Sequence, residues 1–359
     1  MRINELYFMA KWNTFFGPII EGQFCLESLD EWLKTNRINY TKVIVLTDSN
    51  VNQMCLPIFL GELKNIGKTA IIEIEPGEAS KSFEIISQLH LALLDNQADR
   101  KSLLISLGGG VVSDIGGFLS STYMRGIEHI IIPTSLLSMI DASIGGKNGV
   151  NINKFKNLSG TFSSSQGVYI YPNFLKSMNE QDLISGFSEI IKHAMLSSKS
   201  LWNDCINCSS TSEFIDLISK AAKVKIDIVE KDNIERGNHR FSLNMGHTIA
   251  HAIEYFNDHN ISHGDAVAAG LWIESEIAFG EGIIDRESVE LLQNLIDKWW
   301  PRLDLQNMDI FQGMIADKKR SSFSKDFYFS LWAGVGKGAI LTVVSKEKIQ
   351  KAKILYAHG

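Results

Sequence analysis

Short apolar runs alternate with longer amphipathic runs along the first half of the chain. The apolar runs are rich in β-branched residues, and a helical pattern such as that of 82–95 separates some of them. Near-continuous apolar strands separated by helices are typical of a parallel sheet buried on both faces. The sequence therefore predicts an α/β domain of the nucleotide-binding type over 1–171, with strands at 42–48, 69–75, 102–107, 129–135 and 167–171.

After Pro172 the pattern changes. Strand-like runs become rare, and long amphipathic stretches continue to about residue 300. This periodicity predicts helices. We therefore expect a second, mostly α-helical domain over 172–359, which fits a chain of 359 residues.

A glycine-rich turn follows the predicted strand at 102–107 and precedes a predicted helix. It contains Gly108, Gly109 and Gly110. Glycines let the backbone approach a pyrophosphate, and a helix N-terminus favours its negative charge. The spacing is not that of G-x-G-x-x-G, so a tight turn without a ligand is the alternative interpretation.

Polar side chains recur at helical spacing over 240–256. If this segment is one helix, Arg240, Asn244, His247, His251 and Glu254 fall on one stripe. Burying such a stripe without partners is costly. Because apolar residues fill the other faces, the stripe should line a site.

The histidines of this stripe are candidate metal ligands, although the segment is not a zinc-protease motif. That motif needs Glu directly after the first histidine, where this chain has Thr248. Glu189 lies on another predicted helix, and His263 precedes a third. Two histidines and a carboxylate are typical of a catalytic zinc site. Spacing alone leaves histidines that are satisfied within the core as an equal alternative.

Composition limits the class of protein. The net charge of −6 and the pI near 5.9 argue against general nucleic-acid binding. We see no transmembrane stretch and no secretory signal, and we expect a cytoplasmic enzyme. Several cations nevertheless lie among glycines or small residues, as at Arg125, Lys147 and Lys337, which indicates an anionic substrate. The isolated pair Cys205 and Cys208 is interpreted as two free thiols, with a redox or metal role as the alternative.

Seven motifs resemble those of one family, the 3-dehydroquinate synthases. In order they are GGGVVSDIGGF, YMRGI, IPTSLLSMIDASIGGKNGVN, KNLSG, SEIIKHA, LNMGHTIAHAIE and HGDAVAAG, and the similarity extends over 45–338. The resemblance implies an NAD-binding N-terminal domain, a helical C-terminal domain with a divalent metal (zinc or cobalt), and a homodimer. It implies no nucleic-acid or membrane partner.

The resemblance also assigns roles to individual positions. Glu189, His247 and His263 align with metal ligands. Catalytic positions are Asp141, Lys147, Lys192, Asn244 and His251, the last facing the substrate. Substrate-binding positions are Arg125, Asn157, Lys225, Arg240 and Lys337; Arg125 would reach the phosphate end across the dimer, and Lys223 is the alternative to Lys225. NAD contacts align with Asp48, Asn50, Glu78, Lys81, Gly109, Gly110, Val111, Asp114, Thr134, Ser135, Asp141, Lys156 and Ser177.

The implied reaction is the conversion of 3-deoxy-D-arabino-heptulosonate 7-phosphate, a small-molecule sugar phosphate, to 3-dehydroquinate and phosphate. Oxidation by NAD, β-elimination, reduction and an aldol closure follow one another in this family. Three alternatives stay open. One is another sugar phosphate cyclase, of the 2-epi-5-epi-valiolone synthase or amino-dehydroquinate synthase type. The others are a metal-dependent polyol dehydrogenase and a catalytically inactive binding protein of the same fold.

Overall fold

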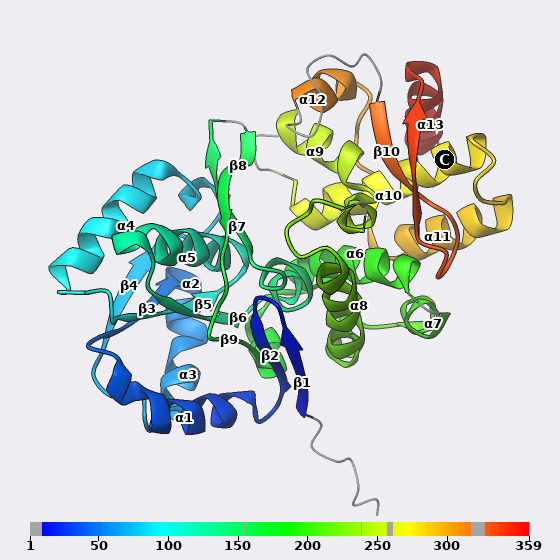
Figure 1. Cartoon of the computed structure of the whole chain (residues 1–359). Coiled ribbons are helices and arrows are strands. Elements are labelled where there is room, and N and C mark those ends of the chain that lie inside the picture. Colours follow the sequence, from blue (N-terminus) through cyan, green and yellow to red (C-terminus); the bar gives the residue numbers. More distant parts are fainter. Residues whose placement is uncertain are drawn as a thin grey trace, which may run out of the picture. The chain divides into compact units, whose positions relative to one another are not determined.

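The computed structural model describes residues 9–153, 155–197, 199–237, 239–256, 261–316 and 327–358, which include every predicted site residue. The chain divides into two compact units, Met1–Asn179 and Glu180–Gly359 (Figure 1). Each unit is described by itself below.

The first unit is built on a seven-stranded sheet of order β1-β2-β9-β6-β5-β3-β4. All pairings from β2 to β4 are parallel, which confirms the predicted sheet, whereas β1 joins the edge antiparallel. The strands of this sheet are β1 (Met9–Thr14), β2 (Gly17–Gly22), β3 (Val43–Asp48), β4 (Thr69–Ile74), β5 (Leu103–Gly108), β6 (Glu128–Pro133) and β9 (Gly167–Ile170).

Helices and helical turns connect these strands. The central strands β5 and β3 are buried almost throughout, and side chains from β3, β5, α4 and α5 form one hydrophobic core. Because both faces of the central strands are covered, their sequences are apolar without alternation. The connecting elements are α1 (Cys25–Asn36), η1 (Arg37–Asn39), α2 (Ser49–Met54), α3 (Leu56–Glu62), η2 (Glu78–Ser80), α4 (Phe83–Asp95), α5 (Gly110–Thr122), η3 (Tyr123–Arg125), η4 (Ser138–Ala142) and η5 (Pro172–Ser177).

Two hairpins of this unit were not predicted. One is the β1–β2 pair at the sheet edge, and the other consists of β7 (Lys147–Ile152) and β8 (Phe155–Phe162), which form a separate two-stranded sheet. Residues of β8 are half-exposed or exposed. Such strands depend on their cross-strand partners more than on intrinsic propensity.

The second unit is mostly helical, as predicted, with one antiparallel hairpin. Its central helix, α10, is buried along most of its length and packs against α6, α9, α11 and α13. The elements are α6 (Glu180–Leu196), α7 (Lys199–Asn207), η6 (Thr211–Leu217), α8 (Ile218–Lys231), η7 (Arg240–Asn244), α9 (His247–Phe256), α10 (His263–Gly280), α11 (Arg286–Trp299), α12 (Ile310–Ala316), β10 (Phe327–Trp332), β11 (Ala339–Val344) and α13 (Lys346–His358).

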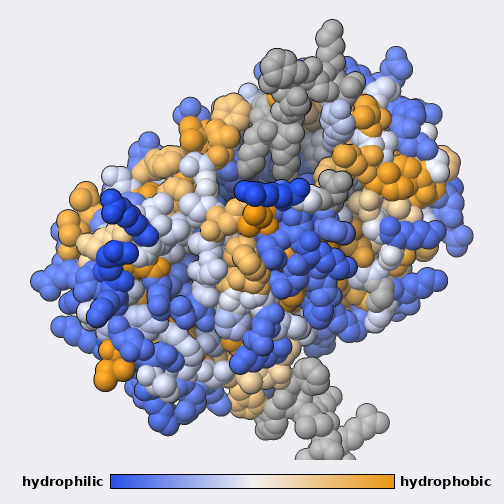
Figure 2. Space-filling model, viewed as in Figure 1, coloured by the Kyte–Doolittle hydropathy of each residue, from blue (hydrophilic) through white to orange (hydrophobic). Residues whose placement is uncertain are grey.

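Hydrophilic side chains cover much of the face shown in Figure 2, and hydrophobic ones gather in separate groups. Among the helices that the structure describes, none has the length and apolar character needed to span a membrane.

Candidate metal and nucleotide sites

Three predicted metal ligands converge in the second unit. Glu189 of α6 is fully buried, and its Oε1 lies 3.3 Å from Nε2 of His247 and 3.5 Å from Nε2 of His263. The three donor atoms lie within 4.8 Å of one another. One carboxylate oxygen and two imidazole nitrogens from three helices make a donor set of the kind that zinc prefers.

Three ionisable side chains, Lys192, His247 and His263, interact with Glu189. Although burial alone would raise its pKa, Lys192 and His247 hold the pKa of Glu189 well below its ordinary value, and Lys192 pairs with its second oxygen. Burial and the nearby Lys192 lower the pKa of His247 to about 4. Burial would lower the pKa of His263 as well, but hydrogen bonds with Glu189 and Glu254 raise it to about 10. A divalent cation at this site would therefore have to displace a proton from His263.

In both His247 and His263, a hydrogen bond at Nδ1 orients the ring. Nδ1 of His247 lies 3.0 Å from the carbonyl oxygen of Met245, and Nδ1 of His263 lies 3.0 Å from Oε1 of Glu254. Such bonds fix the tautomer of a ligating histidine and aim Nε2. In both residues the aimed Nε2 is the atom nearest Glu189.

The segment 240–256 is not one helix, so that prediction was wrong. A 3₁₀ turn at Arg240–Asn244 ends before Gly246, and α9 begins at His247. Gly246 has φ +76°, a left-handed conformation that interrupts a helix and favours glycine. His247 therefore lies in the first turn of α9, and the stripe from Arg240 to Glu254 is broken between Asn244 and His247.

Three glycines set the spacing of the helices that carry the ligands. A Cβ on Gly270 of α10 would lie 2.0 Å from the carbonyl oxygen of Gly246, and one on Gly264 would lie 1.9 Å from that of Ser185 on α6. Ser185 Oγ also accepts hydrogen bonds from the Gly264 N–H and the Ser262 hydroxyl. These close approaches hold α9 and α6 against α10, next to His247 and His263 (Figure 1).

Arg240 and Asn244 lie in the turn just before this group. Arg240 is buried, and its backbone N–H lies 3.5 Å from Oδ2 of Asp232. Oδ1 of Asp232 accepts from the N–H groups of Arg236 and Gly237, which lowers the pKa of this carboxyl. Asp232 thus organises the loop that leads to Arg240, a role that the sequence did not reveal.

The other predicted groups of the second unit differ in exposure. Lys192 is almost completely buried beside Glu189, and the ring of His251 packs edge-on against that of His247 with centroids 5.5 Å apart. Lys225 of α8 is half-buried, whereas Lys223 is exposed and pairs with Asp227. Lys337 is exposed in the β10–β11 turn, and the neighbouring Gly336 N–H donates to the Met195 carbonyl at the end of α6.

In the first unit, the glycine-rich turn lies where predicted. Gly108 ends β5, and Gly109 directly precedes α5 and provides no side-chain cap, whereas Asp48 caps α2 and Ser82 caps α4. Thr134 and Ser135 follow the neighbouring parallel strand β6; the Thr134 N–H donates to the Gly108 carbonyl, and a Cβ on Gly109 would lie 3.3 Å from Ser135 Oγ. These residues therefore meet at the carboxyl edge of the sheet, where such folds bind ligands. Val111 is the next residue of α5 after Gly110.

A polar network lies beside this turn. Nζ of Lys81, which is nearly buried, contacts Asp114 Oδ2 at 2.6 Å and Asn157 Oδ1 at 2.5 Å. Asn151, which was not predicted, connects the network: its side chain donates to Glu78 and accepts from the Asn157 N–H. The structure thus brings together three predicted NAD contacts, Glu78, Lys81 and Asp114, and one predicted substrate contact.

The remaining predicted residues of this unit are more dispersed. Asp48 and Asn50 lie at the start of α2, and burial raises the pKa of Asp48. Ser177 lines a cavity of about 380 Å³ with Cys55, to which it is hydrogen-bonded. Asp141 lies in η4, Lys147 begins β7, Lys156 lies on β8, and Arg125 is exposed with φ +69°.

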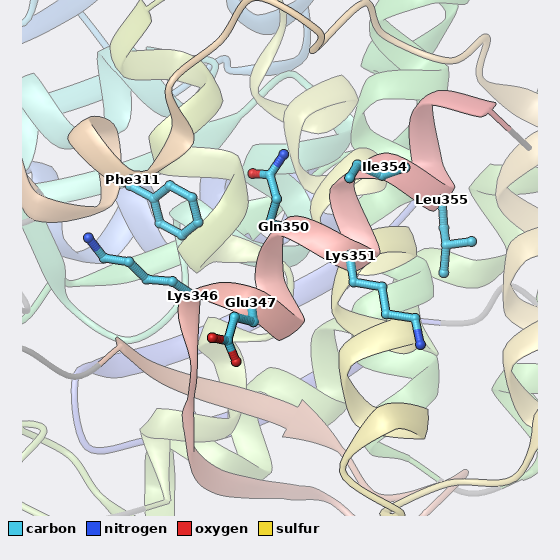
Figure 3. Close-up of a pocket in the computed structure, with 7 residues that line it drawn as sticks. All are labelled: Phe311, Lys346, Glu347, Gln350, Lys351, Ile354 and Leu355. Carbon is cyan, nitrogen blue, oxygen red and sulfur yellow. The ribbon is translucent and has the colours of Figure 1, made fainter.

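Two other features lie outside these sites. Cys205 and Cys208 are free, as predicted. Both are buried, and burial raises the pKa of Cys208 to about 11. A surface cavity of about 580 Å³ lies between α12 and α13 (Figure 3). Its walls consist of Phe311, Ile354, Leu355 and the stems of longer polar residues, and it contains none of the predicted site residues.

Solved structures with the same fold include two synthases. The chain is similar over 98% of its length to a 2-deoxy-scyllo-inosose synthase crystallised with carbaglucose-6-phosphate, NAD⁺ and Co²⁺, covering 100% of that chain, with a TM-score of 0.85 and 23% identity. It is similar over its whole length to a 2-epi-5-epi-valiolone synthase from Streptomyces hygroscopicus with NAD⁺ and Zn²⁺ bound, covering 99% of that chain, with a TM-score of 0.82 and 21% identity. The chain therefore shares the fold of these two synthases.

The sequence identifies the family of the chain. Residues 71–185 match the model of the 3-dehydroquinate synthase N-terminal domain, and residues 186–320 match that of the C-terminal domain. A 3-dehydroquinate synthase from Clostridium kluyveri is 37% identical over 305 residues, which are 82% of this chain and 84% of that protein. The chain belongs to the 3-dehydroquinate synthase family.

Proposed function

We propose that this protein is a carbon–oxygen lyase that converts 3-deoxy-D-arabino-heptulosonate 7-phosphate to 3-dehydroquinate and phosphate. The observation that carries the proposal is the convergence of Glu189, His247 and His263 in a chain that belongs to this family. The proposed enzyme acts in the cytoplasm as a homodimer.

The three donors fit a divalent metal. Glu189 is buried with two imidazole nitrogens within 3.5 Å of one of its oxygens, and both rings are aimed by Nδ1 bonds. Zinc or cobalt bound there would polarise substrate hydroxyls. Lys192 neutralises the other oxygen of Glu189, which limits the charge that the metal must balance.

The first unit fits NAD. The N–H groups at the start of α5 have no side-chain acceptor at Gly109, so a pyrophosphate can accept from them. NAD would supply hydride acceptance and return at the substrate's C5. The residues proposed to contact the nucleotide are Glu78, Lys81 and Asp114 of the polar network, together with Thr134, Ser135 and Asp141. The proposed outer contacts are Asp48, Asn50, Lys156 and Ser177.

Cationic and amide side chains would bind the carboxylate and the phosphate at the two ends of the substrate. Arg240 is buried, and its planar fork suits a carboxylate. Lys225 is proposed rather than Lys223, because Lys223 is exposed and already paired. Fixing both ends restricts the conformations from which elimination and ring closure occur. The other residues proposed for this role are Arg125, Lys147, Asn157, Asn244 and Lys337.

His251 is proposed to face the substrate rather than the metal. Its ring meets the His247 ring edge-on. Among the residues that the structure describes, the group of donor atoms formed by Glu189, His247 and His263 does not include a nitrogen of His251. From this position His251 could move the proton of the C5 hydroxyl, directly or through a water.

Phosphate release on three sugar phosphates tests the proposal. The substrates are 3-deoxy-D-arabino-heptulosonate 7-phosphate, its amino analogue and sedoheptulose 7-phosphate. We expect release from the first alone, with trace NAD, no net rise in NADH absorbance, and deuterium at C5 retained at C5. Preference for another substrate would indicate a different cyclase, stoichiometric NADH would indicate a polyol dehydrogenase, and no turnover with any of them would indicate a binding protein.

A further inference from the structure

The helices α9 and α10, which carry His247 and His263, are also connected by two glutamates, one on each helix. Glu254 of α9 contacts Nδ1 of His263, which begins α10. In the other direction, Oε2 of Glu274 on α10 accepts a 2.7 Å hydrogen bond from the N–H of Gly246, the residue directly before His247. The helix α9 therefore carries His247 and the glutamate that contacts His263. The helix α10 carries His263 and the glutamate that contacts the residue before His247.

Glu274 is placed to fix the start of α9. It is 4% exposed, and its Oε2 lies 2.7 Å from the N–H nitrogen of Gly246. The first N–H groups of a helix have no partner within the helix. The N–H of Gly246 finds its partner in Glu274 of the neighbouring helix, at the point where the chain leaves the left-handed turn at Gly246 and reaches His247.

We propose that Glu274 is a positioning residue for the metal site, an inference that rests on the proposed function. The His247 ring is held by the Met245 carbonyl, so ring and backbone belong to one short segment, 245–247. The Glu274 bond anchors that segment to α10, which also carries His263. Without the bond from Gly246 to Glu274, the segment 245–247 can shift. Nε2 of His247 then moves away from Oε1 of Glu189, which lies 3.3 Å from it.

The same helix offers a matched control. Glu276 lies two residues further along α10 and is likewise almost buried, at 8% exposed. Its oxygens accept from Arg286 and Gln293 of α11, a different helix from the one that carries His247. Removing either carboxylate should destabilise the protein, because Glu274→Met leaves the buried N–H of Gly246 without an acceptor and Glu276→Met removes the hydrogen bonds from Arg286 and Gln293. Only Glu274 should affect the metal.

The experiment compares Glu274→Met, Glu274→Gln and Glu276→Met in the full chain. Zinc affinity is measured by competition with a chelator, the site geometry by the visible absorption of bound Co²⁺, and stability by urea unfolding of the metal-free proteins. We expect Glu274→Met to weaken zinc binding on the order of 10-fold and to change the cobalt spectrum. Glu274→Gln keeps the length and one acceptor oxygen, so it should retain most of the affinity.

For Glu276→Met we expect lower stability with unchanged zinc affinity and cobalt spectrum. Equal losses of zinc affinity in both Met variants, or none in Glu274→Met, would overturn the positioning role while leaving the proposed function intact. An unmodified protein that bound no stoichiometric metal would overturn the proposed function and this inference together.

Discussion

Replacing Gly270 by Ala should disturb the metal site although Gly270 is not a ligand. Gly270 lies in the interior of α10, and an added Cβ would lie 2.0 Å from the carbonyl oxygen of Gly246. The obstacle is backbone, which cannot move away by a side-chain rotation. The helix α10 or the segment that leads into His247 must therefore shift.

The expected change in the free energy of unfolding for Gly270→Ala follows from two opposing effects. Alanine in a helix interior is favoured over glycine by about 1 kcal/mol. Overpacking a well-packed contact costs about 1–3 kcal/mol. Because the approach is so close, we expect the upper part of this range and a net loss of about 2 kcal/mol. Gly280, at the end of the same helix, has nothing within 4 Å of an added Cβ, so Gly280→Ala should be neutral or stabilising.

Urea unfolding of both variants, with and without zinc, tests the argument. Gly270→Ala should be less stable than Gly280→Ala, and it should also gain less stability from a given zinc concentration, because a displaced His247 weakens binding. If Gly270→Ala were as stable as Gly280→Ala and bound zinc as tightly as the unmodified protein, the close contact would have no role in holding the site.

Three further predictions concern other parts of the chain. Chelation should abolish activity and zinc or cobalt should restore it, while His263→Ala should lose bound metal by direct metal analysis; unchanged metal content would refute the ligand assignment. Arg240→Lys should lower kcat/KM on the order of 10-fold or more, but much less with a substrate analogue that lacks the carboxylate. Burial lowers the pKa of His129 to about 3, so the unfolded state takes up a proton that the folded state does not. Stability should therefore fall as pH drops from about 6.5 toward 3, by about 1.4 kcal/mol per pH unit from this group; a His129→Gln variant whose slope was unchanged would contradict this.

The parallel sheet could be predicted because its signal is local. Strands β3 and β5 are apolar runs of β-branched and aliphatic residues, and they are buried almost completely. The β7–β8 hairpin gives no such signal, since β7 reads KNGVNI and β8 alternates between exposed and half-buried positions. Its strands are defined by their antiparallel pairing with each other, which appears only in three dimensions.

The break before α9 shows why part of the site could not be predicted. The spacing of Arg240, Asn244, His247 and His251 fits a continuous helix, and Gly246 alone is tolerated in many helices. The break occurs at Gly246, which has φ +76°, and the carbonyl of Gly246 closely approaches Gly270 on a different helix, a contact that the local sequence does not reveal. The family resemblance could name candidate ligands, but it could not show which carboxylates and glycines contact the segments that carry them.

The contacts around the proposed ligands indicate which substitutions should change metal affinity and which should change only stability. His263 begins α10 directly at the Ser185–Gly264 contact, and His247 begins α9 directly after the Gly246–Gly270 contact. Both histidines therefore lie at helix starts that are fixed by neighbouring helices rather than in helix interiors. Changes that remove the contacts at those starts, including changes at Gly270 and Glu274, should alter metal affinity, whereas a buried change on α10 that contacts neither start, such as Glu276→Met, should alter stability alone. The ligand geometry thus depends on a few interhelical contacts, and the rest of the helical unit supports it only through general stability.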